Sequence, residues 1–253
     1  MRSAGRAAGT IRVGIGGWDY APWRETFYPP KHPKAKQLDY ASRQVTAIEV
    51  NATYFKLRSP DLFARWRDAT PDGFKFAIKA SRFCTNRKLL GEGREGIARF
   101  LGQGIAELGD KLGPILWQFM ATKRFDPEDF AAFLALLPKV EAGVPLTHVL
   151  EPRHESFRTP AFVEMARAAG AGIVLADSPD YPCFDEVSGP VAYARLQDSR
   201  SDEPAGYAPE RLDHWTECAR GWAASGRDAY LFFIGGAKER APAAAAALLE
   251  RLR

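Results

Sequence analysis

Eight short apolar segments alternate with helical segments along the whole chain, and this alternation is the strongest constraint on its fold. The helical segments can carry the chain back, so consecutive strands can lie parallel, as in βαβ units. A chain of 253 residues with eight such strands has the usual size of a (β/α)8 barrel. The sequence therefore predicts an α/β fold with a single TIM-type barrel over residues 11–253, after a flexible tail of residues 1–10. The strands are expected to start near Ile11, Ala47, Phe74, Pro114, His148, Gly172, Val191 and Ala229.

Proline marks the first turn of several expected helices, because its fixed φ suits that position and its missing N–H has no partner there. In Ser59-Pro60 and Asp126-Pro127, a good N-cap residue precedes the proline. The apolar stripe that begins near Glu95 predicts one continuous helix to about Leu112. The connection between residues 178 and 190 holds two prolines and little helical period, so the sixth helix is expected to be short or absent.

The stretch from Ala47 to Phe55 contains a strand with an unusual pattern. Ile48 and Val50 point to one side, whereas Glu49 and Asn51 point to the other, because side chains alternate along a strand. An acid and an amide on one face are rare in a closed core. They suit a parallel barrel, in which one face of each strand meets the helices and the other lines the interior and its mouth.

Other expected strands also place polar side chains on inward positions, mostly in their C-terminal halves, where barrel enzymes keep their active sites. Because their strands are neighbours, we expect Glu49 to pair with Lys79, and Arg153 with Asp177. The alternative interpretation is a structural ion network that plugs the barrel. The inward polar residues are Glu49, Asn51, Lys79, Gln118, Glu151, Arg153, Asp177, Arg195 and Gln197.

These residues suggest a metal-independent enzyme that acts on a small anionic or sugar-like molecule. Glu49 or Glu151 would transfer protons, and Lys79 and Arg153 would hold negative charge. Aromatic residues of the first loop, including Trp18 and Tyr20, would cover the ligand, although packing of that loop over the barrel explains them equally well. Asn51, Gln118, Asp177 and Arg195 complete the expected binding residues. Schiff-base chemistry through Lys79 is a weaker hypothesis, because neighbouring acids would keep the amine protonated.

A protein that binds nucleic acid or nucleotides without catalysis is the alternative from a different class. Surface arginines would contact phosphates, and Trp18 and Tyr20 would serve as stacking platforms. The formal net charge of +4 permits an anionic partner without requiring one. A steep loss of affinity with salt and no turnover would favour this alternative. The sequence leaves the oligomeric state open.

Several other classes of site find little support in the sequence, so we expect no cofactor and no metal ion. The glycines before Trp18 do not form a dinucleotide-binding motif, because Asp19 stands where the third glycine belongs. The four histidines offer no convincing set of three convergent metal ligands. Three cysteines without metal-ligand spacing fit a reducing compartment, so a cytoplasmic protein is expected, and Cys84 is expected to be an unreactive thiol. No apolar run approaches the roughly 20 residues of a membrane span, so no membrane partner is expected.

The motifs resemble those of the YecE-like family, catalogued as a domain of unknown function (number 72). The resemblance rests on Gly17-Trp18 with the first-loop aromatics, Glu49-Val50-Asn51 with Tyr54-Phe55, Glu151 with Arg153-His154, and Asp177-Ser178. It covers nearly the whole chain and implies a TIM-type barrel, but no established activity.

The chain departs from the family pattern at the ends of several strands. Relatives usually have a histidine where this chain has Asn86, and another where it has Gln197. Phe-Asn-Asn-Asp on the eighth strand is replaced by Phe233-Ile234-Gly235-Gly236, and Gln-Leu-Pro-Pro after the fourth strand by residues 118–121. These changes leave two interpretations open: a changed substrate, or lost activity with a retained pocket.

Overall fold

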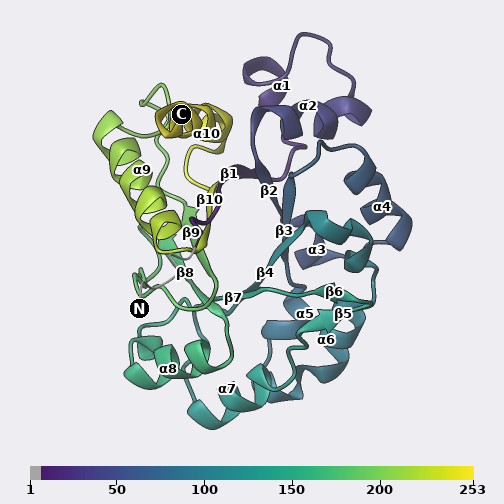
Figure 1. Cartoon of the computed structure of the whole chain (residues 1–253), viewed down its shortest axis with the longest axis vertical. Helices are drawn as coiled ribbons and strands as arrows, with labels where there is room; N and C mark the ends of the chain where they lie inside the picture. Colours follow the sequence, from purple (N-terminus) through teal and green to yellow (C-terminus); the bar gives the residue numbers. More distant parts are fainter. Residues whose placement is uncertain (1–6) are drawn as a thin grey trace.

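Eight parallel strands close into a barrel in the computed structural model, which describes residues 7–253 (Figure 1). Their order around the barrel is β1-β10-β9-β8-β7-β4-β3-β2, and β2 pairs with β1 to close it. The predicted TIM-type barrel is therefore confirmed, and each strand starts within two residues of its expected position. The strands are β1 (Ile11–Gly16), β2 (Ala47–Val50), β3 (Lys75–Lys79), β4 (Leu112–Gln118), β7 (His148–Glu151), β8 (Gly172–Asp177), β9 (Val191–Leu196) and β10 (Asp228–Phe233).

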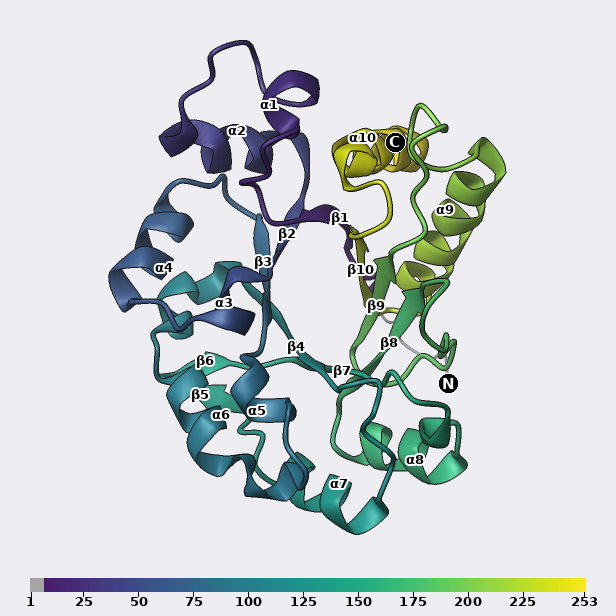
Figure 2. The same ribbon diagram turned by 180° about the vertical axis from the view of Figure 1, so that it is seen from behind.

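Helices surround the barrel on its outside, as Figures 1 and 2 show from opposite sides. Prolines lie in the first turn of α4, α7, α8, α9 and α10, as predicted, and Asp126 and Thr159 cap α7 and α8 with their side chains. The α-helices are α1 (Trp23–Thr26), α2 (Gln37–Gln44), α3 (Ala52–Phe55), α4 (Pro60–Asp68), α5 (Arg82–Thr85), α6 (Arg94–Leu101), α7 (Pro127–Leu134), α8 (Pro160–Ala168), α9 (Pro209–Ala224) and α10 (Ala241–Leu252). The 3-10 helices are η1 (Lys34–Lys36), η2 (Leu90–Gly93), η3 (Ile105–Lys111), η4 (Glu155–Phe157) and η5 (Lys238–Arg240).

The connection between β8 and β9 contains no helix, as its prolines predicted. A small antiparallel hairpin of β5 (Val140–Glu141) and β6 (Val144–Pro145) precedes β7 and was not predicted. Its two turn residues, Ala142 and Gly143, both have positive φ, which is the geometry of a tight two-residue hairpin turn.

The predicted continuous helix from about Glu95 to Leu112 is wrong. The helix ends at Leu101, and the chain resumes as η3 before Leu112 starts β4. Gly104 causes the break, because its φ of 105° lies in the left-handed region and a Cβ there would lie 2.6 Å from Pro60 Cα. The apolar stripe continues past this break because residues on both sides of it are buried in the same outer core.

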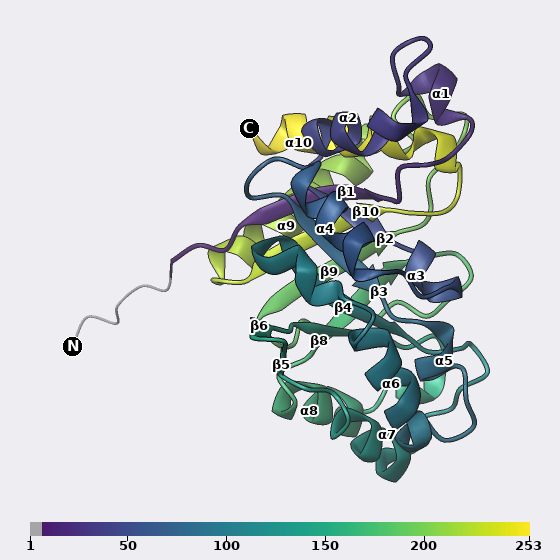
Figure 3. The same cartoon turned by 90° about the vertical axis from the view of Figure 1, so that its right-hand side faces the viewer.

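The strands separate two apolar cores. Alternate residues face the helices, and the other set fills the barrel interior at the level below the mouth. Figure 3 places α3 and α5 together at the end of the barrel away from the N-terminus, and this end is the mouth. The residues of the inner core are Ala47, Ala77, Leu116, Val149, Val174, Val191, Tyr193, Tyr230 and Phe232.

The predicted N-terminal tail of residues 1–10 falls partly outside the described residues, which begin at residue 7. The backbone N–H of Gly9 donates to the carbonyl oxygen of Ala223 at 2.9 Å, and that of Thr10 donates to Asp228 Oδ1 at 2.8 Å. These two residues are therefore attached to the barrel. From residue 7 onward, every helix is too short or too polar to cross a membrane.

Candidate functional site

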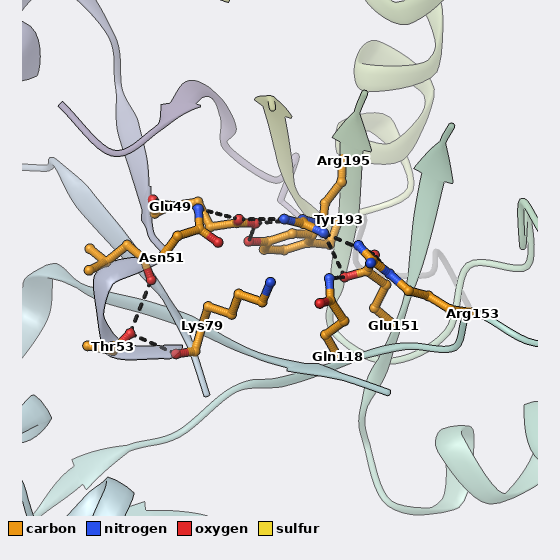
Figure 4. Close-up of polar contacts among 10 residues, drawn as sticks. Glu49, Asn51, Thr53, Lys79, Gln118, Glu151, Arg153, Tyr193 and Arg195 are labelled. Atoms are coloured by element: carbon orange, nitrogen blue, oxygen red, sulfur yellow. Dashed lines mark hydrogen bonds and ion pairs between the residues drawn. The ribbon is translucent and has the colours of Figure 1, made fainter. Parts of the chain in front are cut away.

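Arg195 of β9 lies at the centre of a buried polar cluster in the barrel mouth (Figure 4). Its guanidinium group donates hydrogen bonds to Glu49 of β2 on one side and to Glu151 of β7 on the other, at 2.8–3.0 Å. All three side chains are at most 3% exposed. The planar guanidinium group has its donors in a fixed arrangement, so one arginine can hold two carboxylates in place.

Glu49 accepts hydrogen bonds through both of its carboxylate oxygens. Oε2 accepts from Tyr193 Oη at 2.7 Å and Arg195 Nε at 3.0 Å, and Oε1 accepts from Arg195 Nη2 and Asn51 Nδ2, both at 3.0 Å. Burial raises the pKa of Tyr193, and the negative charge of Glu49 raises it further, so its hydroxyl group remains a donor. Glu49 is therefore fully engaged by its neighbours.

Glu151 is held in the same way at the other side of Arg195. Gln118 Nε2 donates to its Oε2 at 2.8 Å, and Arg153 Nε donates to its Oε1 at 3.0 Å. Burial alone would raise the pKa of Glu151, but the positive charges of Arg195 and Arg153 outweigh it and keep the pKa below its usual value. A carboxylate with this environment remains ionised and is a weak base.

Lys79 of β3 differs from the other charged residues of the cluster. Its side chain extends into the mouth between Glu49 and Gln118 (Figure 4), and it is 8% exposed. Within residues 7–253, its Nζ has no hydrogen-bond acceptor or carboxylate partner, and it lies 4.3 Å from the centre of the Tyr54 ring. Burial, and then the charge of Arg195, lower the pKa of Lys79 to about 8, although Glu151 and Glu49 act in the opposite direction.

The structure brings together most of the predicted site residues, because Glu49, Asn51, Gln118, Glu151 and Arg195 are joined by hydrogen bonds. Arg153 joins them through Glu151, and Lys79 lies beside them. The expected pair of Glu49 with Lys79 is not formed, because Arg195 occupies both oxygens of Glu49.

Asp177 does not face the barrel interior, so its predicted inward position is wrong. It shares its side of β8 with Ile173 and Leu175, which pack in the outer core. Its carboxylate binds Arg211 of α9 at 2.6 Å, rather than Arg153. The sequence did not indicate the outward position of Asp177, because Gly172 at the start of β8 has no side chain that could show which face is inward.

The two predicted aromatic platforms pack into the body of the protein. Trp18 contacts the edge of Trp66, with ring centres 5.1 Å apart, and Tyr20 contacts Trp23 in the same way at 5.5 Å. The ammonium group of Lys238, which was not among the predicted site residues, lies 4.6 Å from the centre of the Tyr20 ring. Tyr193 was also missed, although it shares the inward parity of Arg195 on β9.

Two other expectations concern metal ions and thiols. In the described part of the chain, no three His, Cys, Asp or Glu side chains gather closely enough to hold a metal ion. Cys84 is fully buried, and burial raises the pKa of its thiol to about 12, which is the environment of an unreactive thiol.

Comparisons with known proteins identify the family of this chain. The family model described as protein of unknown function DUF72 matches residues 12–253. The UPF0759 protein YecE of Escherichia coli is 26% identical over 142 residues, which are 54% of this chain and 48% of that protein. The match thus spans only about half the length of this curated relative.

Solved structures extend the likeness to the whole barrel. The crystal structure of a DUF72 family protein from Thermotoga maritima has a TM-score of 0.75 at 22% identity, with 96% of this chain and 98% of that chain covered. Endonuclease IV from Thermus thermophilus has a TM-score of 0.53 at 15% identity, with coverage of 94% and 99%. At these identities, both likenesses show the fold alone.

Proposed function

This chain belongs to the DUF72 family, which is described as a family of unknown function, and we propose that it is an enzyme that acts through Lys79. The proposed substrate is a small anionic or sugar-like carbonyl compound, and the inference rests on the barrel mouth. One observation carries this proposal. Both carboxylates of the mouth are engaged by Arg195, whereas the amine of Lys79 faces the mouth with no acceptor in the described part of the chain.

The surroundings of Lys79 suit a reactive amine. With a pKa of about 8, a substantial share of the side chain is neutral near pH 7.5, and only the neutral amine has the lone pair that attacks a carbonyl carbon. The two glutamates do not keep the amine protonated, because Arg195 and Arg153 offset their charge. This answers the objection that made Schiff-base chemistry the weaker hypothesis from sequence.

The proposed step conserves atoms and charge. Lys79 Nζ attacks the carbonyl carbon of the substrate, and the carbonyl oxygen takes up protons and leaves as water, which yields an imine. Addition of water later reverses this step and frees the amine. Glu49 and Glu151 are proposed to hold Arg195 in place, and Arg195 and Arg153 are proposed to attract the anionic substrate. Proton transfer by the glutamates themselves stays a prediction from the sequence.

Reductive trapping tests this proposal. The protein is incubated with sodium cyanoborohydride and one carbonyl compound at a time: glycolaldehyde, glyceraldehyde 3-phosphate, pyruvate or glyoxylate. Intact mass and peptide mapping then locate the adduct. We expect a single adduct on Lys79 and its loss in Lys79→Met, whereas the control variant Lys56→Met, at an exposed residue of the same rim, should react like the parent protein. Adducts spread over surface lysines, or undiminished in Lys79→Met, would contradict the proposal.

Binding of single-stranded nucleic acid remains the second candidate, and one observation favours it. Phe55 of α3 and Phe83 of α5 are 65% and 60% exposed on adjacent elements of the mouth, beside Lys56 and Arg82. Exposed aromatic and basic side chains together can stack on bases and contact phosphates. Affinity for an oligonucleotide that falls steeply with salt, without any adduct on Lys79, would support this candidate over the enzyme.

A further inference from the structure

A cavity of about 330 Å³ lies beside the barrel mouth, between the loop after β1 and the turn after β2. We call it the first-loop cavity, and its walls include Gly17, Trp18, Asn51, Arg58, Trp66 and Lys238. Asn51 connects it to the polar cluster, because this residue lines the cavity and its Nδ2 donates to Glu49 Oε1 at 3.0 Å. The cavity therefore lies next to the site around Lys79, but Lys79 itself does not line it.

Two cationic side chains of this cavity have unused donors. Arg58 Nη2 donates to the carbonyl oxygen of Ala52 at 3.2 Å, but its Nε is buried without a hydrogen-bond partner among the described residues. Lys238 Nζ lies over the Tyr20 ring, with no acceptor among residues 7–253. A buried donor without a partner is costly, so a ligand that accepts from it would bind favourably.

The charge balance of the first-loop cavity is positive. Asp19 is the acid among its lining residues, and its carboxylate is bound to Lys34 at 2.7 Å. Arg58 and Lys238 have no such carboxylate within the described chain. In the neighbouring polar cluster, by contrast, Glu49 and Glu151 face arginine. This charge balance favours an anionic ligand.

Hydrogen bonds hold the backbone of Arg58 and of Lys238 in place before any ligand binds. The N–H of Arg58 donates to Gln103 Oε1 at 2.8 Å, and the carbonyl oxygen of Lys238 accepts from Trp23 Nε1 at 3.0 Å. The chain reaches Lys238 through a tight turn at Gly236, where φ is 53° and a Cβ would lie 2.4 Å from Ser199 O. Such preorganisation lowers the ordering cost of binding.

We propose that the first-loop cavity binds the phosphate group of a small molecule, with Arg58 and Lys238 as donors and with Trp18 and Trp66 as its apolar wall. Arginine supplies directed N–H donors for phosphate oxygens and lysine a compact charge, a common combination at phosphate sites. That this molecule is also the substrate of Lys79 rests on the proposed function. The binding of phosphate itself does not.

Calorimetric titration with inorganic phosphate, in a chloride buffer of fixed ionic strength, tests the binding. Loss of one charge-assisted donor costs about tenfold or more in affinity, so we expect at least that weakening in Arg58→Met and in Lys238→Met. Lys56→Met is the matched control, because Lys56 is exposed near Arg58 but does not line the cavity, and its affinity should change less than about twofold.

Three results would overturn the phosphate assignment. The first is unchanged phosphate affinity in both cavity variants. The second is acetate binding as tight as phosphate, which would make the cavity a carboxylate site. The third is displacement of phosphate by a single-stranded oligonucleotide whose affinity also depends on Lys56, which would indicate a polyanion surface instead.

Trapping rates separate this inference from the proposed function. Arg58→Met should slow adduct formation by glyceraldehyde 3-phosphate, because that compound has a phosphate group, but should leave the reaction of uncharged glycolaldehyde unchanged. Phosphate binding without any adduct on Lys79 would refute the proposed function and leave the phosphate subsite intact. An adduct on Lys79 that forms equally well with both aldehydes in Arg58→Met would refute the link between the two sites.

Discussion

Arg195 and Glu49 bind each other across the barrel interior: Arg195 Nη2 and Nε donate to the two carboxylate oxygens of Glu49, both at 3.0 Å. Two strands, β10 and β1, separate β9 from β2 around the barrel. The same guanidinium group binds Glu151 through Nη1, so one residue connects three parts of the wall. Each glutamate therefore compensates the charge of a nearly fully buried arginine.

We expect Glu151→Ala and Glu49→Gln to destabilise the protein. Either change leaves the buried Arg195 without one of its two anionic partners, and such a loss costs about 3–5 kcal/mol. In a chain of this length that corresponds to a melting temperature lower by roughly ten degrees. Thermal and denaturant unfolding measure the effect. Glu155→Ala is the control, because Glu155 forms an exposed pair with Arg158, and near-neutral melts of both cluster variants would refute a structural role for the glutamates.

Lys79→Met should have the opposite effect on stability at neutral pH. The pKa of Lys79 is lowered from 10.5 in the unfolded chain to about 8 in the fold, so below pH 8 the folded state contains a disfavoured ammonium group. Replacement by Met removes that cost, about 3 kcal/mol. The advantage of Lys79→Met should shrink as pH rises from 8 to 10.5, because the folded protein has then lost the proton whose burial is costly.

Unfolding in urea at pH 7 and at pH 10 measures this difference. If the Lys79→Met variant is less stable than the parent protein at pH 7, Lys79 is a structural partner of the glutamates. A uniform loss of stability in variants of Glu49, Glu151 and Lys79 would favour a barrel plug over a site.

The parity of the strands explains how far the site could be predicted from sequence. In β2, the alternation of Ile48 and Val50 with Glu49 and Asn51 fixes the register, because apolar residues face the helices. In β8 the alternation is lost, because small or apolar side chains occupy both faces, so Asp177 was placed on the wrong one. In such a strand, tertiary packing determines which face a polar residue occupies, and the local sequence pattern does not indicate it.

Sequence patterns did not predict the contacts between distant segments of the chain. The first-loop cavity joins Trp18, Arg58 and Lys238, which are far apart in the chain, and none of them belongs to a long periodic element. The break of the long helix at Gly104 had a local signal, a glycine, but the stripe of apolar residues around it favoured a continuous helix.

Asp177→Ala should leave the barrel mouth unchanged. The carboxylate binds Arg211, whose side chain is 46% exposed, and such a partly solvated pair contributes about 0–1 kcal/mol. We therefore expect a melting temperature within about three degrees of that of the parent protein, and the same extent of reductive trapping on Lys79. Reduced trapping in this variant would show that Asp177 acts in the site despite its outward position.

The reactivity of Lys79 should depend on pH in a way that identifies its environment. Competitive labelling with trace acetic anhydride measures the neutral fraction of an individual amine, with N-acetyl-lysine as an internal standard. For Lys79 we expect half-maximal labelling near pH 8, because burial and Arg195 disfavour the ammonium form. The ε-amine of the standard should reach its half-maximum at pH ~10.4, the usual value for a solvated lysine side chain. A titration of Lys79 that coincides with the standard would mean that the glutamates, not the arginines, dominate the potential at the amine, and Schiff-base chemistry near neutral pH would then lose its physical basis.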